Sequence, residues 1–354
     1  MKKIFIGIDF SKEKFDATAI YAENGFMQCA ESLYETFSNN KSGFKKLVSW
    51  VKRMMRQYKC EISNILLCGE NTGIYSELIS DLLYEGGYTM WLESPLQIKR
   101  SMGLQRIKND KADSAAIATY ALRFQDRMVS YKPLCPDLKA LKELFKARAM
   151  LVKQRTALAV RAKEKTSTDA TLSDAMKVIA ACSRRMLKQL GEEIKRLEKQ
   201  MQKVIENSKE LKTTFEILCS MNGIGLQNAA AMMVYTNNFE RFDHDPRKIA
   251  CYYGVAPFAH QSGTSVNGKP HTSSYADKRL KALLSEAAKC SIRFCDELRT
   301  YYERLLNKGK NKMVALNNVK NKLIHILVAM VKSKQKYNPN HKLQLALQYA
   351  KSNN

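Results

Sequence analysis

The sequence predicts an α/β domain followed by a mostly helical second half. Short apolar runs alternate with helical patterns over residues 1–132, as an α/β sheet requires. Residues 137–212 contain almost no glycine or proline and keep helical spacing, and helical patterns return before the C-terminus. We therefore expect a first domain over 1–132, a long basic helical hairpin (coiled coil) over 133–212, a C-terminal domain over 213–338 and a tail over 339–354.

The first domain opens on a short apolar run from Ile4 to Asp9, which is rich in isoleucine and predicts a buried strand. Alternation around Phe15, Ala17 and Ala19 predicts a second strand that pairs with the first as a hairpin. The expected elements that follow are a helix over 42–58, a strand over 62–68, a helix over 75–84, a strand over 88–92 and a helix that begins at Asp110.

The second half is predicted to be built from helices. Two long antiparallel helices are expected within 137–212, because the apolar residues recur at helical spacing. A helix, a turn at Gly223-Ile-Gly225 and another helix follow, and residues 260–271 are expected to form a polar loop. The remaining helices are expected over 278–290, 296–306 and 314–332.

The charge balance indicates a polyanionic partner. Lysine plus arginine total 59 against 34 acidic residues, a formal net charge of +25. Nucleic acid is favoured, because basic residues that neutralise phosphates release counterions; an anionic membrane surface is the weaker alternative. No apolar stretch approaches the ~20 residues that a membrane span needs. The first apolar run stops at Asp9 without a cleavage site, so we expect a cytoplasmic protein.

Four acidic residues form the candidate catalytic centre. Asp9 and Glu70 each end a predicted strand, and Asp110 and Asp113 share one face at the start of a predicted helix. Converging carboxylates repel one another, and Mg²⁺ or Mn²⁺ resolves the repulsion because hard cations bind carboxylate oxygens and keep water or phosphate as further ligands. Two such ions ~4 Å apart would clamp the attacking and leaving oxygens of phosphoryl transfer. One acid at a strand end is more often structural, but four together favour a metal site.

The two long helices carry many basic residues. A charged helix face is usually only solvated, and the glutamates interspersed on the second helix support that interpretation there. The first helix is nearly free of acids after Glu143, so we expect it to contact phosphates. The residues predicted to make these contacts are Lys146, Arg148, Lys153, Arg155, Arg161 and Lys163.

Two further segments are candidates for contact with a phosphate. The Gly223-Ile-Gly225 turn would point backbone N–H groups outward from a helix N-terminus, a good cradle for one phosphate, but a plain tight turn explains it equally well. The polar loop holds Ser262 and Gly263, with Lys269 and Lys278 beyond them. These residues alone do not distinguish Ser262 from the neighbouring serines.

Several motifs occur in order along the chain. The first half contains Ile-Gly-Ile-Asp-Phe-Ser-Lys, Cys-Gly-Glu-Asn-Thr-Gly-Ile-Tyr and Lys-Asn-Asp-Lys-Ala-Asp-Ser-Ala-Ala-Ile-Ala. The second half contains Met-Asn-Gly-Ile-Gly, Ala-Cys-Tyr-Tyr-Gly-Val-Ala-Pro, His-Gln-Ser-Gly and the late Tyr-Tyr-Glu-Arg with Lys308-Gly-Lys310. Their combination resembles the DEDD transposases of bacterial insertion sequences, the bridge-RNA-guided recombinase family that is also known as Piv-type.

The resemblance implies a ribonuclease-H or RuvC-like mixed sheet in the first domain, where Asp9, Glu70, Asp110 and Asp113 hold magnesium. It also implies a C-terminal transposase domain whose nucleophile is the serine before glycine in a Pro-x-x-x-x-Ser-Gly pattern, which is Ser262 when counted from Pro257. Further implications are a phosphoserine link to donor and target DNA, guidance by a structured bridge RNA, and a homo-oligomer, either a dimer or a tetramer.

One departure from the family pattern lies after the serine. Where the family commonly has Lys-x-Gly-Asn or Lys-x-Gly-Asp, this chain has Ser-Ser-Tyr-Ala-Asp-Lys-Arg-Leu-Lys over 273–281. Lys278 and Arg279 still supply positive charge that would neutralise the scissile phosphate. Two alternatives stay open: a RuvC-like nuclease that cuts branched DNA with metal-activated water, and a non-catalytic basic protein that only binds nucleic acid.

Overall fold

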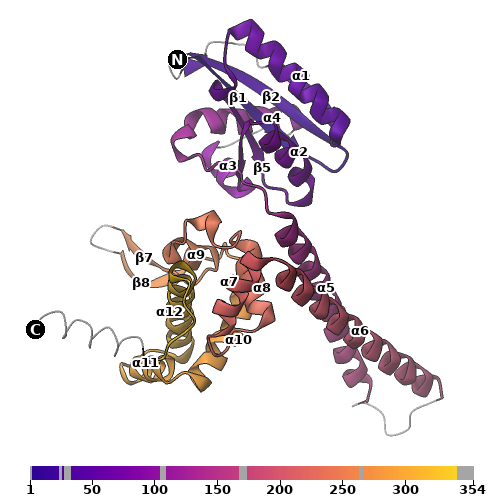
Figure 1. The fold of residues 1–354 in the computed structure, drawn as a ribbon, viewed down its shortest axis with the longest axis vertical. Coiled ribbons are helices and arrows are strands. Elements are labelled where there is room, and N and C mark those ends of the chain that lie inside the picture. Colours follow the sequence, from indigo (N-terminus) through magenta and orange to yellow (C-terminus); the bar gives the residue numbers. More distant parts are fainter. Residues whose placement is uncertain are drawn as a thin grey trace, which may run out of the picture. The chain divides into compact units, whose positions relative to one another are not determined.

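The structure is a computed structural model that describes residues 2–23, 26–27, 33–103, 109–166, 174–262 and 266–340 (Figure 1). The chain divides into two compact units, residues 1–133 and 134–354. The sequence places its first boundary between 132 and 133, next to Pro133. Each unit has a hydrophobic core of its own, and each is described by itself below.

Unit 1 is built on a mixed six-stranded sheet. Its strands are β1 (Lys2–Phe10), β2 (Lys14–Glu23), β3 (Phe26–Met27), β4 (Leu33–Ser38), β5 (Ile65–Glu70) and β6 (Thr89–Glu93). The order is β3-β2-β1-β5-β6, and β4 pairs with β2. β2 runs antiparallel to β1, whereas β5 and β6 run parallel to it. The predicted hairpin and the predicted mixed sheet are both confirmed.

Helices cover both faces of this sheet (Figure 1). They are α1 (Lys41–Tyr58), α2 (Ile74–Glu85), α3 (Pro95–Ser101) and α4 (Asp110–Arg123). Successive residues of a strand face opposite sides, so Ile4, Ile6 and Ile8 pack in one cluster with residues of α1, while Phe5 packs in another with residues of α4. From one edge, β3 and β4 pair antiparallel with β2, and β2 pairs antiparallel with β1; β5 and β6 then follow in parallel with β1. This strand order, with helices on both faces, is that of a ribonuclease-H-like fold.

The close approach of α4 to β1 depends on Gly7. A Cβ atom built on Gly7 would lie 2.1 Å from the carbonyl oxygen of Ser114 and 2.2 Å from the backbone nitrogen of Ala118. Across the same contact, the hydroxyls of Thr18 on β2 and Ser114 on α4 are hydrogen-bonded at 2.7 Å, and both residues are buried. The absent side chain therefore lets the backbone of α4 rest directly on the sheet.

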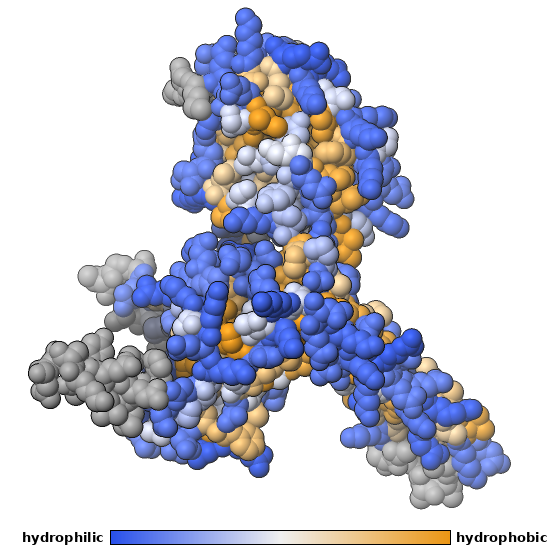
Figure 2. Space-filling model, viewed as in Figure 1, coloured by the Kyte–Doolittle hydropathy of each residue, from blue (hydrophilic) through white to orange (hydrophobic). Residues whose placement is uncertain are grey.

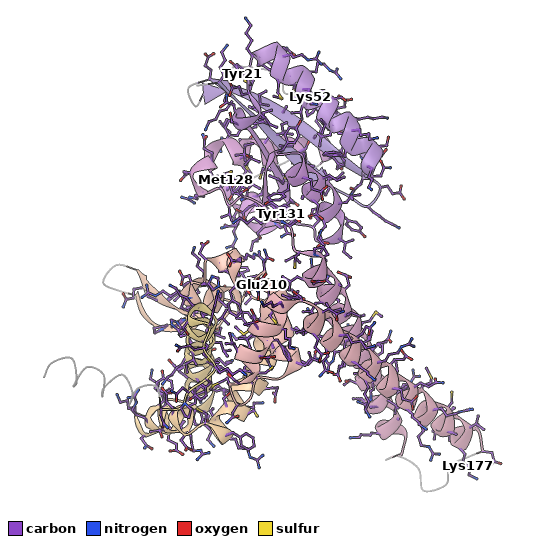
Figure 3. All side chains as sticks on the ribbon, viewed as in Figure 1. Tyr21, Lys52, Met128, Tyr131, Lys177 and Glu210 are labelled. Carbon is purple, nitrogen blue, oxygen red and sulfur yellow. The ribbon has the colours of Figure 1, made fainter. Side chains whose placement is uncertain are left out.

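Unit 2 is mostly helical. Its helices are α5 (Pro136–Thr166), α6 (Asp174–Asn207), α7 (Lys209–Cys219), α8 (Leu226–Tyr235), α9 (Pro246–Tyr252), α10 (Lys278–Phe294), α11 (Asp296–Asn307) and α12 (Lys312–Ser333). α5 and α6 form the expected long hairpin, and Lys177 near the start of α6 lies toward its loop end (Figure 3). The other helices and the near end of the hairpin share one core. Among the described residues, none of the helices is long and apolar enough to cross a membrane.

The structure differs from the sequence-based expectation in several places, and it also contains β4, α3 and α9, which the sequence patterns do not predict. Within the expected polar loop over 260–271, residues 260–262 and 266–271 lie in two antiparallel strands, β7 (Pro257–Ser262) and β8 (Val266–Thr272). Their exposed polar residues show no apolar alternation, which is the signal that predicts strands. The strand expected over 62–68 begins with a 3-10 turn at Ile62–Asn64, and α6 ends at Asn207, before α7 starts as a separate helix.

Candidate active site

In unit 1, two of the four predicted acids lie on the sheet and the other two lie at the start of α4, the helix that packs on β1. Asp9 stands near the end of β1 and Glu70 is the last residue of β5. Because β1 and β5 are parallel, their carboxyl ends meet at the same edge of the sheet. Asp110 and Asp113 occupy the first turn of α4, where the side chain of Asn109 accepts a hydrogen bond from the backbone N–H of Ala112 at 2.7 Å. This cap fixes the start of the helix that carries both acids.

The carboxylates of this centre interact with one another. Burial is the main cause that raises the pKa of Asp9, and repulsion from Asp113, Asp110 and Asp16 raises it further, against an opposing effect of Lys14. Burial also raises the pKa of Glu70, with added repulsion from Asp9 and Asp113. The two strand-end acids are therefore less readily ionised than ordinary carboxyl groups, because they are partly buried and their neighbours are negative.

Asp16 is a fifth acid of this centre that the sequence reasoning missed. It lies opposite Asp9 in the β1–β2 register and is only 2% exposed. Its carboxylate accepts hydrogen bonds from Thr36 Oγ1 at 2.6 Å and from the hydroxyl of Tyr34. Burial alone would raise the pKa of Asp16, but hydrogen bonds from Thr36, Tyr34 and Lys14 outweigh it and lower that pKa. The sequence does hold a signal for Asp16, because this acidic residue lies inside a predicted strand whose alternate residues are apolar.

Lys14 joins the acids of the sheet to those of the helix. Its Nζ lies 2.7 Å from Asp110 Oδ2 and 3.2 Å from Asp16 Oδ2. These hydrogen bonds, first with Asp110 and then with Asp16, raise the pKa of Lys14 well above its ordinary value. The lysine is thus a fixed positive charge beside the acidic centre.

The donor set suits a hard divalent cation. Carboxylate oxygens are the ligands that Mg²⁺ and Mn²⁺ prefer. Burial and, after it, repulsion between the acids raise the pKa of Asp9 and Glu70, and a bound cation would offset both effects. As the side chains stand in the described part of the chain, no three of the histidine, cysteine, aspartate and glutamate residues are grouped closely enough to hold a metal ion. The residues fit a metal, but they would have to draw together to bind it.

In unit 2 the two turn glycines have different surroundings. Gly223 has a φ of +100°, and a Cβ atom there would lie 2.5 Å from Ser291 Oγ and 2.7 Å from the carbonyl oxygen of Ala287, so this residue is needed where the turn packs on α10. Gly225 precedes α8 and has no atom within 4 Å of such a Cβ. It borders an open cleft of about 590 Å³ that is also lined by Lys195 and Lys199.

Two of the predicted basic contacts on α5 are ion-paired with glutamates, and the other four are exposed at the surface. Lys146 is ion-paired with Glu143 at 2.8 Å, and Arg148 is ion-paired with Glu198 of α6 at 2.7 Å. The other predicted residues of α5 are exposed at the surface, namely Lys153, Arg155, Arg161 and Lys163. Figure 2 shows a largely hydrophilic surface over this hairpin, with scattered apolar residues.

The segment that departs from the family pattern caps and packs α10. Asp277 accepts hydrogen bonds from the backbone N–H groups of Arg279 and Leu280 at 2.8 and 3.2 Å, as an N-cap does. Arg279 lies over the rings of Phe145 and Tyr235, 5.1 and 5.8 Å from their centroids. Lys278, by contrast, is exposed at the first turn of the helix.

Ser262 is the last residue of β7. The side chains of Ser262 and Lys269, and all of Gly263, lie outside the described residues. Two residues before Ser262, the ring of His260 stands 5.0 Å, centroid to centroid, from the ring of His271 on β8. The strand hairpin thus carries the predicted serine next to a pair of exposed imidazoles.

Fold and site together define a ribonuclease-H-like protein with an acidic centre, joined to a basic helical unit. A DEDD transposase model of the IS110 group matches residues 6–166, and the model of the transposase IS116/IS110/IS902 family matches residues 215–303. The chain belongs to this IS110 family of transposases and is a DNA transposase or recombinase enzyme. The family resemblance drawn from the sequence motifs is confirmed.

The chain is similar to several relatives and to a solved structure, each over a different share of its length. The pilin gene-inverting proteins of Moraxella bovis and Moraxella lacunata are each 26% identical over 95% of this chain and 98% of their own. A 43.6 kDa protein of insertion element IS110 from Streptomyces coelicolor is 31% identical over 33% of this chain and 28% of its own. T. thermophilus RuvC in complex with a Holliday junction substrate is 14% identical, with a TM-score of 0.26, over 36% of this chain and 99% of its own. The ribonuclease-H-like fold of unit 1 is defined by its strand order, β3-β2-β1-β5-β6.

Proposed function

We propose that this chain recombines DNA, with an acidic metal centre in unit 1 and a serine nucleophile in unit 2. The observation that carries the proposal is geometric: Asp9 and Glu70 stand at the carboxyl ends of the parallel strands β1 and β5, and Asp113 stands in the first turn of α4, which packs on the same sheet. Folded proteins seldom gather like charges without a counter-charge, and a basic chain of net charge +25 has negatively charged partners. A divalent cation would supply the counter-charge to the acids, and DNA, on which a transposase of this family acts, would be the negatively charged partner.

Asp9, Glu70, Asp110 and Asp113 would hold Mg²⁺, and Mn²⁺ also suits their oxygens. When bound, such an ion supplies positive charge to the phosphate that is cut. The chain's own part is to position the acids: Asn109 caps the turn of α4 that carries two of them. Thr36 and Tyr34 hold the neighbouring Asp16 ionised.

The covalent step is proposed for Ser262. Its Oγ forms a bond to the scissile phosphorus while one phosphorus–oxygen bond of the DNA backbone breaks, and the proton lost by the serine ends on the oxygen that leaves. The phosphodiester energy is retained in the phosphoserine until another DNA end attacks. The Pro-x-x-x-x-Ser-Gly pattern from Pro257 and membership of the family support this assignment.

The proposal includes a structured guide RNA, a homo-oligomer and a cytoplasmic site of action. The exposed basic residues of α5, such as Lys153 and Arg161, support a nucleic-acid partner, and the family resemblance supports the guide RNA and the dimer or tetramer. Similarity to pilin gene-inverting proteins over nearly the whole chain supports recombination between DNA sites. RNA that co-purifies with the protein, once sequenced, is expected to be one defined species rather than a random sample.

Trapping of a protein–DNA adduct tests the chemistry. Wild-type protein incubated with end-labelled DNA of the element and its co-purified RNA is expected to give a denaturant-stable adduct in Mg²⁺. Ser262→Ala is expected to abolish the adduct, while Ser274→Ala, a change at an exposed serine of the same region, leaves it unchanged. Asp113→Asn and chelation of the metal are each expected to reduce adduct formation by about 100-fold or more.

Each of these measurements distinguishes the proposed function from one alternative. Cleavage without any adduct would indicate a nuclease that uses water, and salt-sensitive binding without cleavage would indicate a non-catalytic binder. An unchanged adduct in Ser262→Ala would remove the serine from the mechanism. Full activity of Asp113→Asn after chelation would remove the metal centre.

A further inference from the structure

Lys14 makes the contact that connects the two halves of the acidic centre. It is the first residue of β2, and its side chain is 47% exposed. Its ammonium lies between Asp16 on the sheet and Asp110 on α4, at 3.2 and 2.7 Å from one carboxylate oxygen of each. The shorter bond is to Asp110, which is one of the four residues assigned above to the metal.

The two ends of this bridge differ in how firmly they are held. The side chain of Asp16 is 3% exposed and is fixed by Thr36 and Tyr34. The side chain of Asp110 is 55% exposed, and it stands in the first turn of its helix. Lys14 is therefore anchored on the Asp16 side, and Asp110 is the partner that is free to turn away.

We propose that Lys14 is a positioning residue that competes with the metal ion for Asp110. This inference rests on the metal site of the proposed function. The ammonium supplies the positive charge that the acids otherwise lack, and it occupies an oxygen of Asp110 that a metal needs. This explains why the described acids, although they repel one another, are not gathered into a metal-binding group.

The competition has a consequence for how the metal binds. An ion that must first break the Lys14–Asp110 ion pair binds less tightly than one that meets a free carboxylate. Such a weakened site depends more on the phosphate oxygens that DNA brings as additional ligands. Lys14 thereby favours metal binding in the presence of substrate over metal binding alone.

Mn²⁺ binding to the full chain, without nucleic acid, tests this inference. Free Mn²⁺ is measured by its electron paramagnetic resonance signal at low ionic strength. Lys14→Gln is expected to bind Mn²⁺ about three- to tenfold more tightly than wild type. Lys14→Arg, which keeps a cation at Asp16, is expected to stay within about threefold of wild type, and so is Lys52→Gln, a loss of charge on the outer side of α1 (Figure 3).

A double-mutant cycle separates competition at Asp110 from a general effect of charge. In an Asp110→Asn background, Lys14→Gln is expected to change Mn²⁺ affinity by less than about twofold, because the contested oxygen is no longer ionised. Equal affinity of Lys14→Gln and wild type would overturn the inference, as would the same gain in both backgrounds. Absence of Mn²⁺ binding by wild type, or binding that Asp113→Asn leaves unchanged, would instead overturn the metal site of the proposed function.

Discussion

Two aspartates that face each other across β1 and β2 are held in opposite electrostatic states. Asp9 has a raised pKa, chiefly because of burial and then of its acidic neighbours. Asp16 is less exposed to solvent, yet hydrogen bonds from Thr36, Tyr34 and Lys14 give it a lowered pKa. The pair shows that the surroundings of a carboxylate, rather than its depth alone, decide whether its charge is stable. Asp9 is poised to gain from a cation, whereas Asp16 is already stabilised by two hydroxyl groups and by Lys14.

This difference predicts opposite effects of neutral substitutions. A raised pKa means that folded Asp9 keeps its proton at a pH where the unfolded chain has lost it. Wild-type stability therefore falls as pH rises from the unfolded value near ~4 through the folded pKa. Asp9→Asn is expected to raise the free energy of unfolding at pH 7 in chelator, on the order of 0.5–1 kcal/mol after solvent screening, and to lose this advantage near pH ~4.

Asp16→Asn is the matched control. Because the pKa of Asp16 is lowered, its stabilising contribution is present above the unfolded pKa and is lost as pH falls through the folded pKa. The substitution is expected to lower stability at pH 7 by about 1 kcal/mol or more. The two tryptophans, Trp50 and Trp91, both lie in unit 1, so urea unfolding followed by tryptophan fluorescence reports on this unit. Shifts of the same sign in both variants would contradict the assignment.

At the scale of elements, the position of the acids depends on how α4 lies against the sheet. Gly7 stands two residues before Asp9 on the same face of β1, and the backbone of α4 occupies the space of its missing side chain. The start of α4 then carries Asp110 and Asp113 past the ends of β1 and β5. The geometry of the centre therefore rests on a helix–sheet contact that tolerates no side chain.

Gly7→Ala is expected to damage both stability and metal binding. The added methyl would collide with backbone atoms of Ser114 and Ala118, which cannot rotate away as a side chain can. We expect unit 1 to lose about 3 kcal/mol or more of its unfolding free energy. Mn²⁺-dependent stabilisation is expected to disappear as well, because α4 is displaced. Tryptophan fluorescence in urea, with and without Mn²⁺, measures both effects.

The control for that substitution is Gly225→Ala. Gly225 has a φ of −114°, which an alanine adopts without strain, and nothing lies within 4 Å of the added Cβ. Because this glycine belongs to unit 2, the tryptophan transition of unit 1 is expected to stay where it is. Retention of wild-type stability by Gly7→Ala would show that α4 can shift without loss.

Most elements of unit 1 could be predicted from the sequence, because apolar periodicity dictates them. The buried strand from Ile4 and the amphipathic helix over 42–58 correspond to β1 and α1. The hairpin of β7 and β8 could not be predicted in the same way, since its few apolar residues do not alternate with polar ones and most of its described side chains are exposed. Its pairing is set by cross-strand hydrogen bonds, which leave little trace in hydropathy.

The candidate site was predicted in part. Strand-end position and i, i+3 spacing suffice to select Asp9, Glu70, Asp110 and Asp113. Asp16 and Lys14 escaped prediction because their roles depend on strand register and on which face of β2 meets α4. Likewise, the pairing of Arg148 with Glu198 depends on the alignment of α5 with α6, and residue spacing along one helix does not reveal it.

At the scale of the whole molecule, the excess of positive charge raises the question of which basic residues contact phosphates. Exposed basic residues of α5 were predicted to contact phosphates, but Lys146 and Arg148 each have an acidic partner. An ion-paired side chain must break that pair before it neutralises a phosphate, so its net contribution to binding is smaller. Lys153 and Arg161 are exposed on the same helix and are the better candidates.

The salt dependence of DNA binding is expected to distinguish these groups. A side chain that neutralises one phosphate contributes about one unit to the slope of log affinity against log salt concentration. Lys153→Ala and Arg161→Ala are each expected to reduce that slope by about 1, and Lys146→Ala by clearly less. Lys52→Ala removes an exposed charge from α1 in unit 1 (Figure 3) and is expected to leave the slope unchanged. Fluorescence anisotropy of a labelled duplex between about 50 and 200 mM salt measures all four. Equal losses in Lys52→Ala and Lys153→Ala would mean that the net charge of the chain, rather than the surface of α5, sets the affinity.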